Sequence, residues 1–241
     1  MKILVLVAHP DDEAILCGAT INKLVRKGHD VHVTFFTRND EAYFGHESQQ
    51  DRQKRAVLES RKSSKMLGFS MTNLKFLDMH LVDNKALLMK AIIKVIRLVQ
   101  PTVIITEHSE DKHIDHRTLG DLVPEANFQS GHNLCGGTLK WSAPLILHGE
   151  INLEMTMPFA FEAISNVSAI DIIQKEAAFH CYATVDKEHS IDAAWLNKKL
   201  KYVAQIRGQS AGYMFGEAFT ISSYTPIAPS ALRACAEVLE I

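Results

Sequence analysis

Short apolar runs alternate with longer amphipathic segments along the first half of this chain, and this alternation restricts its fold more than any other feature. Residues 3–7 form an unbroken apolar run, and residues 102–106 contain a second one, as is typical of parallel strands buried on both faces. Two more strands are expected at 31–37 and 74–77. The spacing of apolar residues predicts helices at 14–27, 48–67, 84–99 and 114–128, the last with a kink or an end at Pro124.

This order of strands and helices predicts an α/β fold that is Rossmann-like, with a mostly parallel sheet and helices on both faces. The second half of the chain is less regular, with a strand expected at 143–147 and helices at 168–180 and 192–206. No repeat or linker separates the halves, so we expect a single domain over residues 1–241. A strand order of 3-2-1-4 would make the first and fourth strands neighbours, and ligands bind outside the carboxyl ends of strands at such a point.

Charge and hydropathy exclude several classes of protein. The chain has 26 Lys and Arg against 28 Asp and Glu, a net charge of −2, so we expect no nucleic-acid partner. No apolar stretch approaches the ~18 residues of a membrane-spanning helix. The apolar run at residues 3–7 is too short for the core of a signal peptide, so we expect a cytoplasmic protein.

Two clusters of histidine and carboxylate residues follow the two most apolar strands. Residues 8–13 (Ala-His-Pro-Asp-Asp-Glu) come directly after the first strand, and residues 111–116 (Asp-Lys-His-Ile-Asp-His) come after the fourth. Because these strands are expected to be neighbours, both clusters should meet in one crevice at the carboxyl edge of the sheet. Either cluster alone is a weak signal, whereas the pair predicts a site.

Two imidazoles and one carboxylate suit a catalytic zinc ion, which keeps three protein ligands and an open position for water. His9 and Asp12 lie three residues apart on a turn that enters a helix, and His116 can complete the set from the facing loop. We therefore predict that His9, Asp12 and His116 bind Zn²⁺, with another divalent metal such as Fe²⁺ as an alternative.

The remaining residues of the clusters suit proton transfer. Asp11 is placed to accept a proton from a metal-activated water, as a carboxylate within hydrogen-bond reach can. His113 could donate a hydrogen bond to an oxyanion or protonate a leaving nitrogen, and Asp115 could orient a neighbouring imidazole. Arg38 and Arg55 are candidates for binding an acidic substituent of the substrate.

Both clusters resemble the motifs of the PIG-L family of N-acetylglucosaminyl deacetylases, also called LmbE-like proteins. The resemblance rests on residues 8–13 and on the His-x-Asp-His motif at 113–116, with a weaker echo in Glu217-Ala218-Phe219. It implies a Rossmann-like fold, a divalent metal, and hydrolysis of an acetamide on a glucosamine unit.

The resemblance also implies roles for the residues that match its motifs. His9, Asp12 and His116 would bind the metal, Asp11 would be the general base, and His113 would assist at the oxyanion or leaving group. These roles agree with those expected from the chemistry of the side chains.

The chain departs from the family pattern in two places. Residues 38–41 (Arg-Asn-Asp-Glu) stand where the family usually has a Gly-Glu pair, and residues 180–183 (His-Cys-Tyr-Ala) stand where it often has His-x-Ser-Gln. Both segments lie where substrate contacts are expected, so the sequence leaves the identity of the substrate open.

Several alternatives remain open at this point. The chain could hydrolyse another N-acylated small molecule instead of an amino sugar. Two histidines and a carboxylate also form the facial triad of non-haem iron oxygenases. A non-catalytic protein on a nucleotide-binding fold is disfavoured, because two carboxylates stand where a phosphate would need glycines and backbone amides. We expect a small-molecule amino-sugar substrate, and the sequence leaves assembly into a homo-oligomer open.

Overall fold

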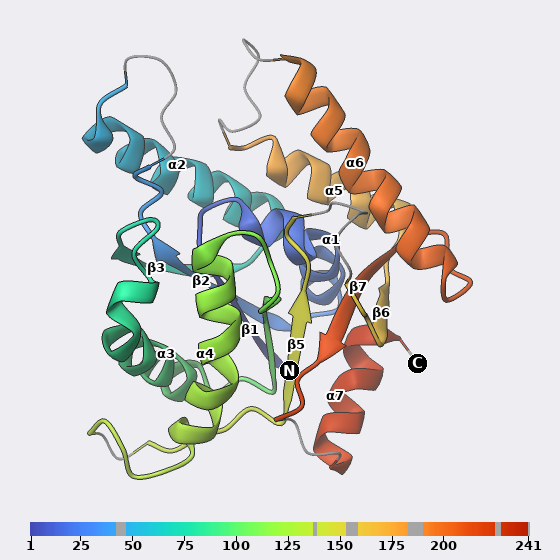
Figure 1. Cartoon of the computed structure of the whole chain (residues 1–241). Helices are drawn as coiled ribbons and strands as arrows, with labels where there is room; N and C mark the ends of the chain where they lie inside the picture. The colour runs from blue at the N-terminus through green and yellow to red at the C-terminus, as the bar shows by residue number, and fades with distance from the viewer. Residues whose placement is uncertain (42–46, 137–138, 153–158, 183–189, 225–227, 241) are drawn as a thin grey trace.

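A seven-stranded sheet lies at the centre of the described part of the chain (Figure 1). The computed structural model describes residues 1–241 except 42–46, 137–138, 153–158, 183–189, 225–227 and 241, and it does not describe the side chains of 190–197. The strand order is β3-β2-β1-β4-β5-β7-β6. The strands are β1 (Lys2–Val7), β2 (Asp30–Thr37), β3 (Ser70–Phe76), β4 (Val103–Glu107), β5 (Leu145–Gly149), β6 (Ala163–Asn166) and β7 (Gly216–Ile221).

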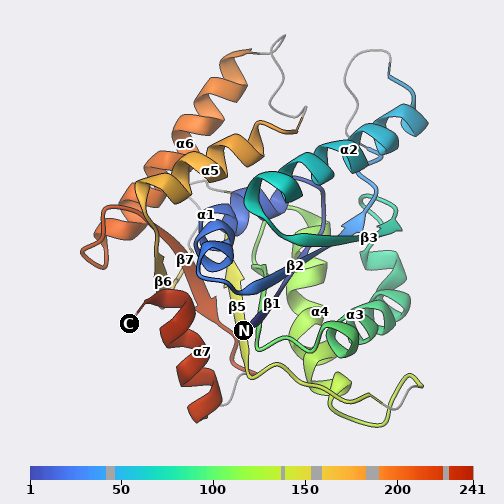
Figure 2. The ribbon, with the colours of Figure 1, turned by 180° about the vertical axis from the view of Figure 1, so that it is seen from behind.

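The strands from β1 to β5 are parallel, whereas β7 runs antiparallel to both of its neighbours, β5 and β6. Helices cover both faces of this sheet (Figures 1 and 2). They are α1 (Asp12–Arg26), α2 (Gln49–Leu67), α3 (Lys85–Val99), α4 (Ile114–Ser130), α5 (Ala169–Phe179), α6 (Ser190–Gln209) and α7 (Pro229–Leu239), with a short 3₁₀ turn at Val82–Asn84.

The pleat of the strands divides the core into two layers. On β1, Val5 belongs to the layer that packs against α1, α5 and α7, while its neighbours Leu4 and Leu6 belong to the layer that packs against α3 and α4. A strand buried on both faces therefore needs apolar residues at every position, which explains the unbroken run at residues 3–7.

The predicted α/β fold, Rossmann-like with helices on both faces, is confirmed, as is the strand order 3-2-1-4. Three details differ from expectation. Strand β3 begins at Ser70 instead of residue 74. Its first half carries polar residues, as edge strands often do, so the apolar pattern that predicts a strand begins only at residue 74. Helix α4 continues through Pro124 to Ser130. The elements β6, β7 and α7 were not predicted.

Within the described residues, no helix is both long enough and apolar enough to cross a membrane. Two features of the fold matter for the site. The register pairs Leu6 with Thr106, so the residues that follow β1 and β4 leave the sheet side by side. In α4, a side chain at Gly120 would come within 2.7 Å of the Glu107 carbonyl oxygen, so glycine lets this helix lie directly against the end of β4.

Candidate active site

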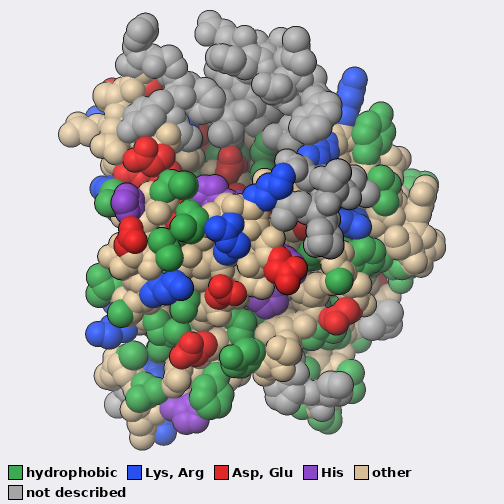
Figure 3. Space-filling model, in the orientation of Figure 1, with side chains coloured by type: hydrophobic (Ala, Val, Ile, Leu, Met, Phe, Trp, Pro, Cys, Tyr) green, Lys and Arg blue, Asp and Glu red, His purple; other side chains and the backbone are tan. Residues whose placement is uncertain are grey.

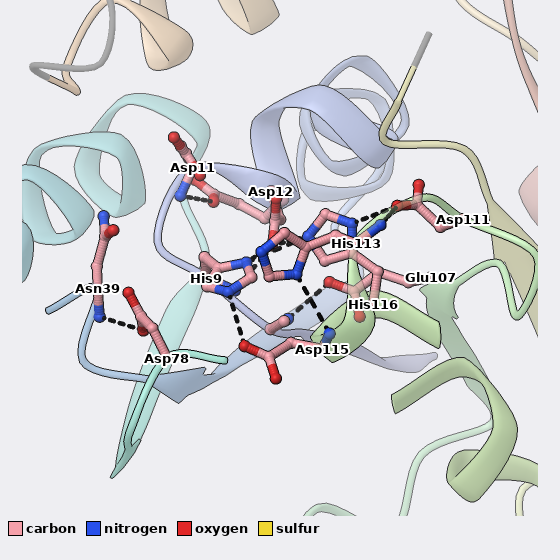
Figure 4. A network of polar contacts seen from close by, with 12 residues as sticks. His9, Asp11, Asp12, Asn39, Asp78, Glu107, Asp111, His113, Asp115 and His116 are labelled. Carbon is pink, nitrogen blue, oxygen red and sulfur yellow. Dashed lines mark hydrogen bonds and ion pairs between the residues drawn. The ribbon is translucent and has the colours of Figure 1, made fainter. Parts of the chain in front are cut away.

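The segments that follow β1 and β4 meet at the carboxyl edge of the sheet and bring the two polar clusters together (Figure 4). The backbone N–H of Ala8 donates to Oε1 of Glu107 at 2.6 Å and ties the end of one strand to the end of the other. In the space-filling view, histidine and acidic side chains gather in a recess on the upper part of the face shown (Figure 3). This is the edge at which a ligand site was expected.

Three donor atoms converge on one point of this recess. Nδ1 of His9 lies 3.1 Å from Oδ2 of Asp12 and 3.2 Å from Nε2 of His116. The third side of the triangle, from Nε2 of His116 to Oδ2 of Asp12, is also 3.2 Å. Asp12 and His116 are buried, and the backbone N–H of His9 holds Oδ2 of Asp12 in place at 2.7 Å.

These residues fit a divalent cation. A tetrahedral site with bonds of about 2.0 Å has edges of about 3.3 Å, close to the three measured sides of 3.1, 3.2 and 3.2 Å. His116 belongs to two sets of neighbouring donors that could hold a metal ion, one with His9 and His113 and the other with Asp12 and Glu107. Two imidazoles and a carboxylate are donors that zinc and iron accept.

The charges around the triangle favour a cation as well. Burial lowers the pKa of His9, but the charge of Asp12 and hydrogen bonds with Asp115 and Asp12 outweigh it and raise the pKa to about 10. Burial likewise opposes the charged form of His116, yet the charges of Asp12 and Glu107 raise its pKa to about 12. Although burial raises the pKa of Asp12, the two imidazoles hold it well below its usual range. The protein therefore stabilises positive charge where the three donors meet.

A second carboxylate stands behind each imidazole. Nε2 of His9 lies 3.2 Å from Oδ2 of Asp115, and Nδ1 of His116 lies 2.9 Å from Oδ1 of Asp111. Each carboxylate can accept the N–H of the ring nitrogen that faces away from the triangle. A cation bound at the centre would displace the other ring proton, and the inward nitrogen would then offer its lone pair. Asp115 is itself fixed by the backbone N–H groups of Met79 at 2.6 Å and Leu81 at 3.1 Å.

His113 lies against the triangle without being one of its corners. Its ring centroid is 4.6 Å from that of His9 and 4.7 Å from that of His116. As the N-cap of α4, its Nδ1 accepts the backbone N–H of Asp115 at 3.2 Å. Burial and the neighbouring charges of His9 and His116 lower the pKa of His113, which favours the neutral ring. With Nδ1 acting as acceptor, the single proton lies on Nε2, which is available as a donor.

Asp11 occupies the N-cap position of α1 with a φ of 114°, in the left-handed region. Its backbone N–H points to Oε2 of Glu13 at 3.3 Å. Glu13 is fully buried, and its other oxygen accepts hydrogen bonds from Ser63 Oγ at 2.6 Å and Tyr182 Oη at 2.7 Å. In Figure 4 the Asp11 side chain points away from the three ligand atoms, on the side of α2. Its charge acts on the buried guanidinium of Arg52 in that helix.

Helix α1 is interrupted just after the turn that carries Asp12. Cys17 has φ −150° and ψ 28°, outside the helical region. A buried ion pair supplies the hydrogen bonds that the interruption removes. Nζ of Lys175 donates to the Ile15 carbonyl at 2.7 Å, and the Glu217 carboxylate accepts the N–H groups of Ala19 at 3.2 Å and Thr20 at 2.7 Å (Lys175 and Glu217 contact each other at 2.5 Å). The helix is therefore kinked at Cys17, and the turn that carries Asp12 points in a different direction from the rest of α1.

Each of the two arginines proposed to bind substrate has an acidic neighbour in the structure. Arg55 of α2 pairs with Glu47 and, at 3.1 Å, with Glu59, and these partners raise its pKa. Nε of Arg38, directly after β2, lies 3.3 Å from Oδ2 of Asp40. The structure gives Arg55 a role in pairing acidic neighbours, whereas Arg38 lines an open groove on the outer side of β3.

The structure describes residues 38–41 and 180–182 of the two departures from the family pattern, whereas residue 183 lies outside the described residues. Asn39 has a φ of 57°, and asparagine tolerates this left-handed conformation better than other residues with a side chain, so it can stand where a glycine is usual. Tyr182 ends the segment after α5 and donates its hydroxyl to Glu13. Glu13 lies in the first turn of α1, next to the N-cap Asp11, and a sequence motif alone does not reveal this contact.

Sequence reasoning assigned no role to Asp111, Glu107 or Glu13. Asp111 orients His116 and also accepts the side-chain N–H of Asn152 at 2.6 Å and the backbone N–H of His113 at 2.8 Å. Burial raises the pKa of Glu107 well above its usual range. The only signal for these residues in the sequence was their position. Glu13 and Asp111 belong to the two polar clusters, and Glu107 is the last residue of the strand before the second cluster.

Comparisons with known proteins agree with this description. The family model described as PIG-L: GlcNAc-PI de-N-acetylase matches residues 4–127. The N,N'-diacetylchitobiose deacetylase from Pyrococcus horikoshii is similar in structure, with a TM-score of 0.81 and 22% identity over 95% of this chain and 86% of that one.

Two further structures share the fold. A conserved protein from Thermus thermophilus has a TM-score of 0.78 and 22% identity over 94% of this chain and 97% of its own. GalB, the 4-carboxy-2-hydroxymuconate hydratase from Pseudomonas putida, has a TM-score of 0.77 and 19% identity over 91% of this chain and 95% of its own. One fold therefore hosts at least two kinds of reaction, so the reaction has to be argued from the site.

Proposed function

The chain belongs to the PIG-L family, and on that premise we propose that it is a metal-dependent hydrolase that removes the acetyl group from an N-acetylated amino sugar. The observation that carries this proposal is the triangle of His9 Nδ1, Asp12 Oδ2 and His116 Nε2, whose sides suit a catalytic zinc ion. The similarity to an N,N'-diacetylchitobiose deacetylase supports an acetylated glucosamine unit as the substrate.

The three corner residues would hold the cation, and Asp115 and Asp111 would keep the two imidazoles oriented towards it. When bound, such a cation lowers the pKa of water towards ~7 and polarises an amide carbonyl. Fe²⁺ suits the same donors, so the choice of metal is part of the proposal.

The other residues would move protons. Asp11 would accept a proton from the water that adds to the acetamide carbon. This requires its side chain to turn from α2 towards the recess, and catalytic hydrogen bonds often form only in the substrate complex. Nε2 of His113 would donate to the carbonyl oxygen as charge develops there. The proton that Asp11 accepted from the water would then be delivered to the amide nitrogen as the C–N bond breaks, which yields acetate and the free amine.

The proposal is tested by a screen for acetate release from N-acetylglucosamine, N,N'-diacetylchitobiose and N-acetylglucosamine conjugates. The expected result is one acetate and one new primary amine per substrate consumed, with activity lost on chelation and restored by Zn²⁺ or Fe²⁺. Release from an N-acetyl amino acid alone would instead support hydrolysis of another N-acylated small molecule.

The similarity to a hydratase supports a second candidate, addition of water across a carbon–carbon double bond. The two reactions differ in their products, because hydration adds water without releasing acetate. Turnover of an unsaturated hydroxy acid with no acetate release from any amide would favour hydration. Oxygen uptake that depends on iron and a co-substrate would favour an oxygenase.

A further inference from the structure

The outer side of the sheet between α2 and β3 is not packed as a core. Helix α2 runs above β3, and Gly68 turns the chain from the end of the helix towards the start of the strand (Figure 2). Near that turn, Met71 of β3 packs against the core. Farther along the same face of the strand, Asn73 and Lys75 replace apolar residues and line an open groove beside the first half of α2. Lys75 is exposed and Asn73 is partly buried, as an edge strand allows, so this stretch of β3 leaves a polar groove open to solvent instead of a packed contact.

This groove has a volume of about 560 Å³ and one sign of charge. Arg38, Lys54, Arg61 and Lys75 line it, and none of the described residues that line it is acidic. Lys54 and Arg38 each have an acidic neighbour, at 3.5 Å and 3.3 Å respectively. The side chains of Arg61 and Lys75 form no hydrogen bond or ion pair with any residue that the structure describes.

Four cations around one groove repel each other, and Asp40 and Asp51 offset the charge of only two of them, Arg38 and Lys54. The whole chain carries a net charge of −2, so this concentration of positive charge is local. A groove lined by one sign of charge focuses its field and raises the local concentration of counter-ions. The first turns of α2, which contribute Gln50 and Gln53 to the groove, add the positive end of the helix dipole.

We propose that the groove between α2 and β3 binds a small anion with two or more negative charges, of the organic phosphate class. Guanidinium groups at Arg38 and Arg61 match the geometry of phosphate oxygens, and Lys54 and Lys75 add mobile charge. The amides of Gln50, Gln53 and Asn73 supply neutral donors.

The volume selects the class of ligand. About 560 Å³ lies within the range of ~300–1,000 Å³ that small-molecule sites occupy. A nucleic acid needs a continuous basic stripe, which a chain with balanced charge does not provide. The site is distinct from the triangle of metal donors and does not depend on the proposed deacetylation.

Calorimetric titration of the metal-loaded protein with inorganic pyrophosphate tests this inference. The wild type should bind pyrophosphate, and its affinity should fall as salt screens the four cations. Arg61→Gln and Lys75→Gln should each weaken binding by about tenfold or more, because each removes a charge that pairs with no described residue. Lys90→Gln and Lys94→Gln, exposed on α3 across the sheet, are the matched controls and should leave the affinity unchanged.

Pyrophosphate also coordinates divalent metals, so the variants decide where it binds. Binding that is unaffected by Arg61→Gln and Lys75→Gln but is abolished by chelating the metal would overturn the proposal. So would equal losses in the α3 controls, or the absence of pyrophosphate binding at low salt. Vesicles that contain anionic lipid serve as a second probe, and binding to vesicles without binding to pyrophosphate would also contradict a small-molecule site.

Discussion

Asp11 has a backbone conformation that few residues other than glycine adopt, with φ at 114°. Such a conformation costs on the order of 1–3 kcal/mol and persists only where the surroundings enforce it. Here the buried Glu13 receives the Asp11 N–H and is in turn held by Ser63 and Tyr182. Strained residues cluster at functional sites, and this one lies next to a candidate metal ligand.

Asp11→Asn tests whether this strained residue is the base. Asparagine keeps the size of the side chain and tolerates a positive φ, so the loop should remain folded and the metal content unchanged. An amide cannot accept the proton from water, so we expect kcat to fall by ~10²-fold or more. Steady-state kinetics together with elemental analysis provide the measurement. Near-normal turnover at unchanged metal content would exclude Asp11 as the base.

His113→Ala distinguishes a catalytic donor from a ligand. His113 lies outside the triangle of His9, Asp12 and His116, and its Nε2–H is the donor left free once Nδ1 has capped α4. We expect normal metal binding, little change in KM, and a fall in kcat of roughly 10²–10³-fold. If His113→Ala lost the metal and His116→Ala kept it, the two roles would be exchanged.

At the scale of the elements, the interruption of α1 allows one helix to serve two purposes. Its first turn presents Asp12 to the site, while the turns after Cys17 pack in the core. The buried Lys175–Glu217 pair supplies both new helix ends with partners. Removing one member of a buried pair leaves the other charge unpaired and costs about 3–5 kcal/mol.

We therefore expect Lys175→Met and Glu217→Gln each to lower the free energy of unfolding by about 3–5 kcal/mol. The double variant should lose less than the sum of the two, by at least about 1 kcal/mol, because neither charge is left alone. Urea denaturation measures all four proteins. Strictly additive losses would show that the pair does not act as a unit.

The start of α5 gives a pH-dependent prediction away from the site. Asp171 is buried and accepts hydrogen bonds from Ser168, Asn22 and Arg26, within a capping box. Burial raises its pKa, but these bonds outweigh that effect and lower the pKa below its ordinary value of 3.8. A carboxylate with a depressed pKa contributes stability above its unfolded pKa and loses it as pH falls through the folded one.

Asp171→Asn should lower the free energy of unfolding at pH 7 by about 1–3 kcal/mol. The difference from the wild type should shrink as pH falls below 3.8, where the unfolded state takes up its proton. Denaturation midpoints measured from pH 7 to pH 3 provide the comparison. Asp30→Asn, at an exposed position, is the control and should change little. A constant difference across this range would contradict the role of the Asp171 charge.

At the scale of the whole molecule, the sequence predicts the half of the sheet that holds the site. β1 and β4 are apolar on both faces, so they can be recognised without tertiary information. The crossover rule limits the possible topologies, and 3-2-1-4 is the order expected of a doubly wound sheet. β6 is a four-residue strand at the far edge, and β7 lies between β5 and β6 and runs antiparallel to both. Their pairing is a tertiary contact that leaves little periodicity in the sequence.

The candidate site also has a part that the sequence predicts and a part that it does not. Both polar clusters could be predicted because each follows a buried strand. Sequence spacing does not show that Asp111 lies behind His116, that Tyr182 reaches Glu13, or that Arg55 pairs with Glu47. Those contacts depend on how helices and loops approach the edge of the sheet. The roles of His9, Asp11, and the other cluster residues stay predictions until variants are measured.

Zinc titration of the metal-stripped protein, followed by acetate release from N,N'-diacetylchitobiose, tests the central claim most directly. Because three protein donors surround one point, activity should rise in proportion to added Zn²⁺ and level off at about one ion per chain. His116→Ala should show neither the tight binding nor the rise in activity. Full activity in the stripped protein, or an unchanged titration in His116→Ala, would contradict a metal-dependent deacetylase built on His9, Asp12 and His116.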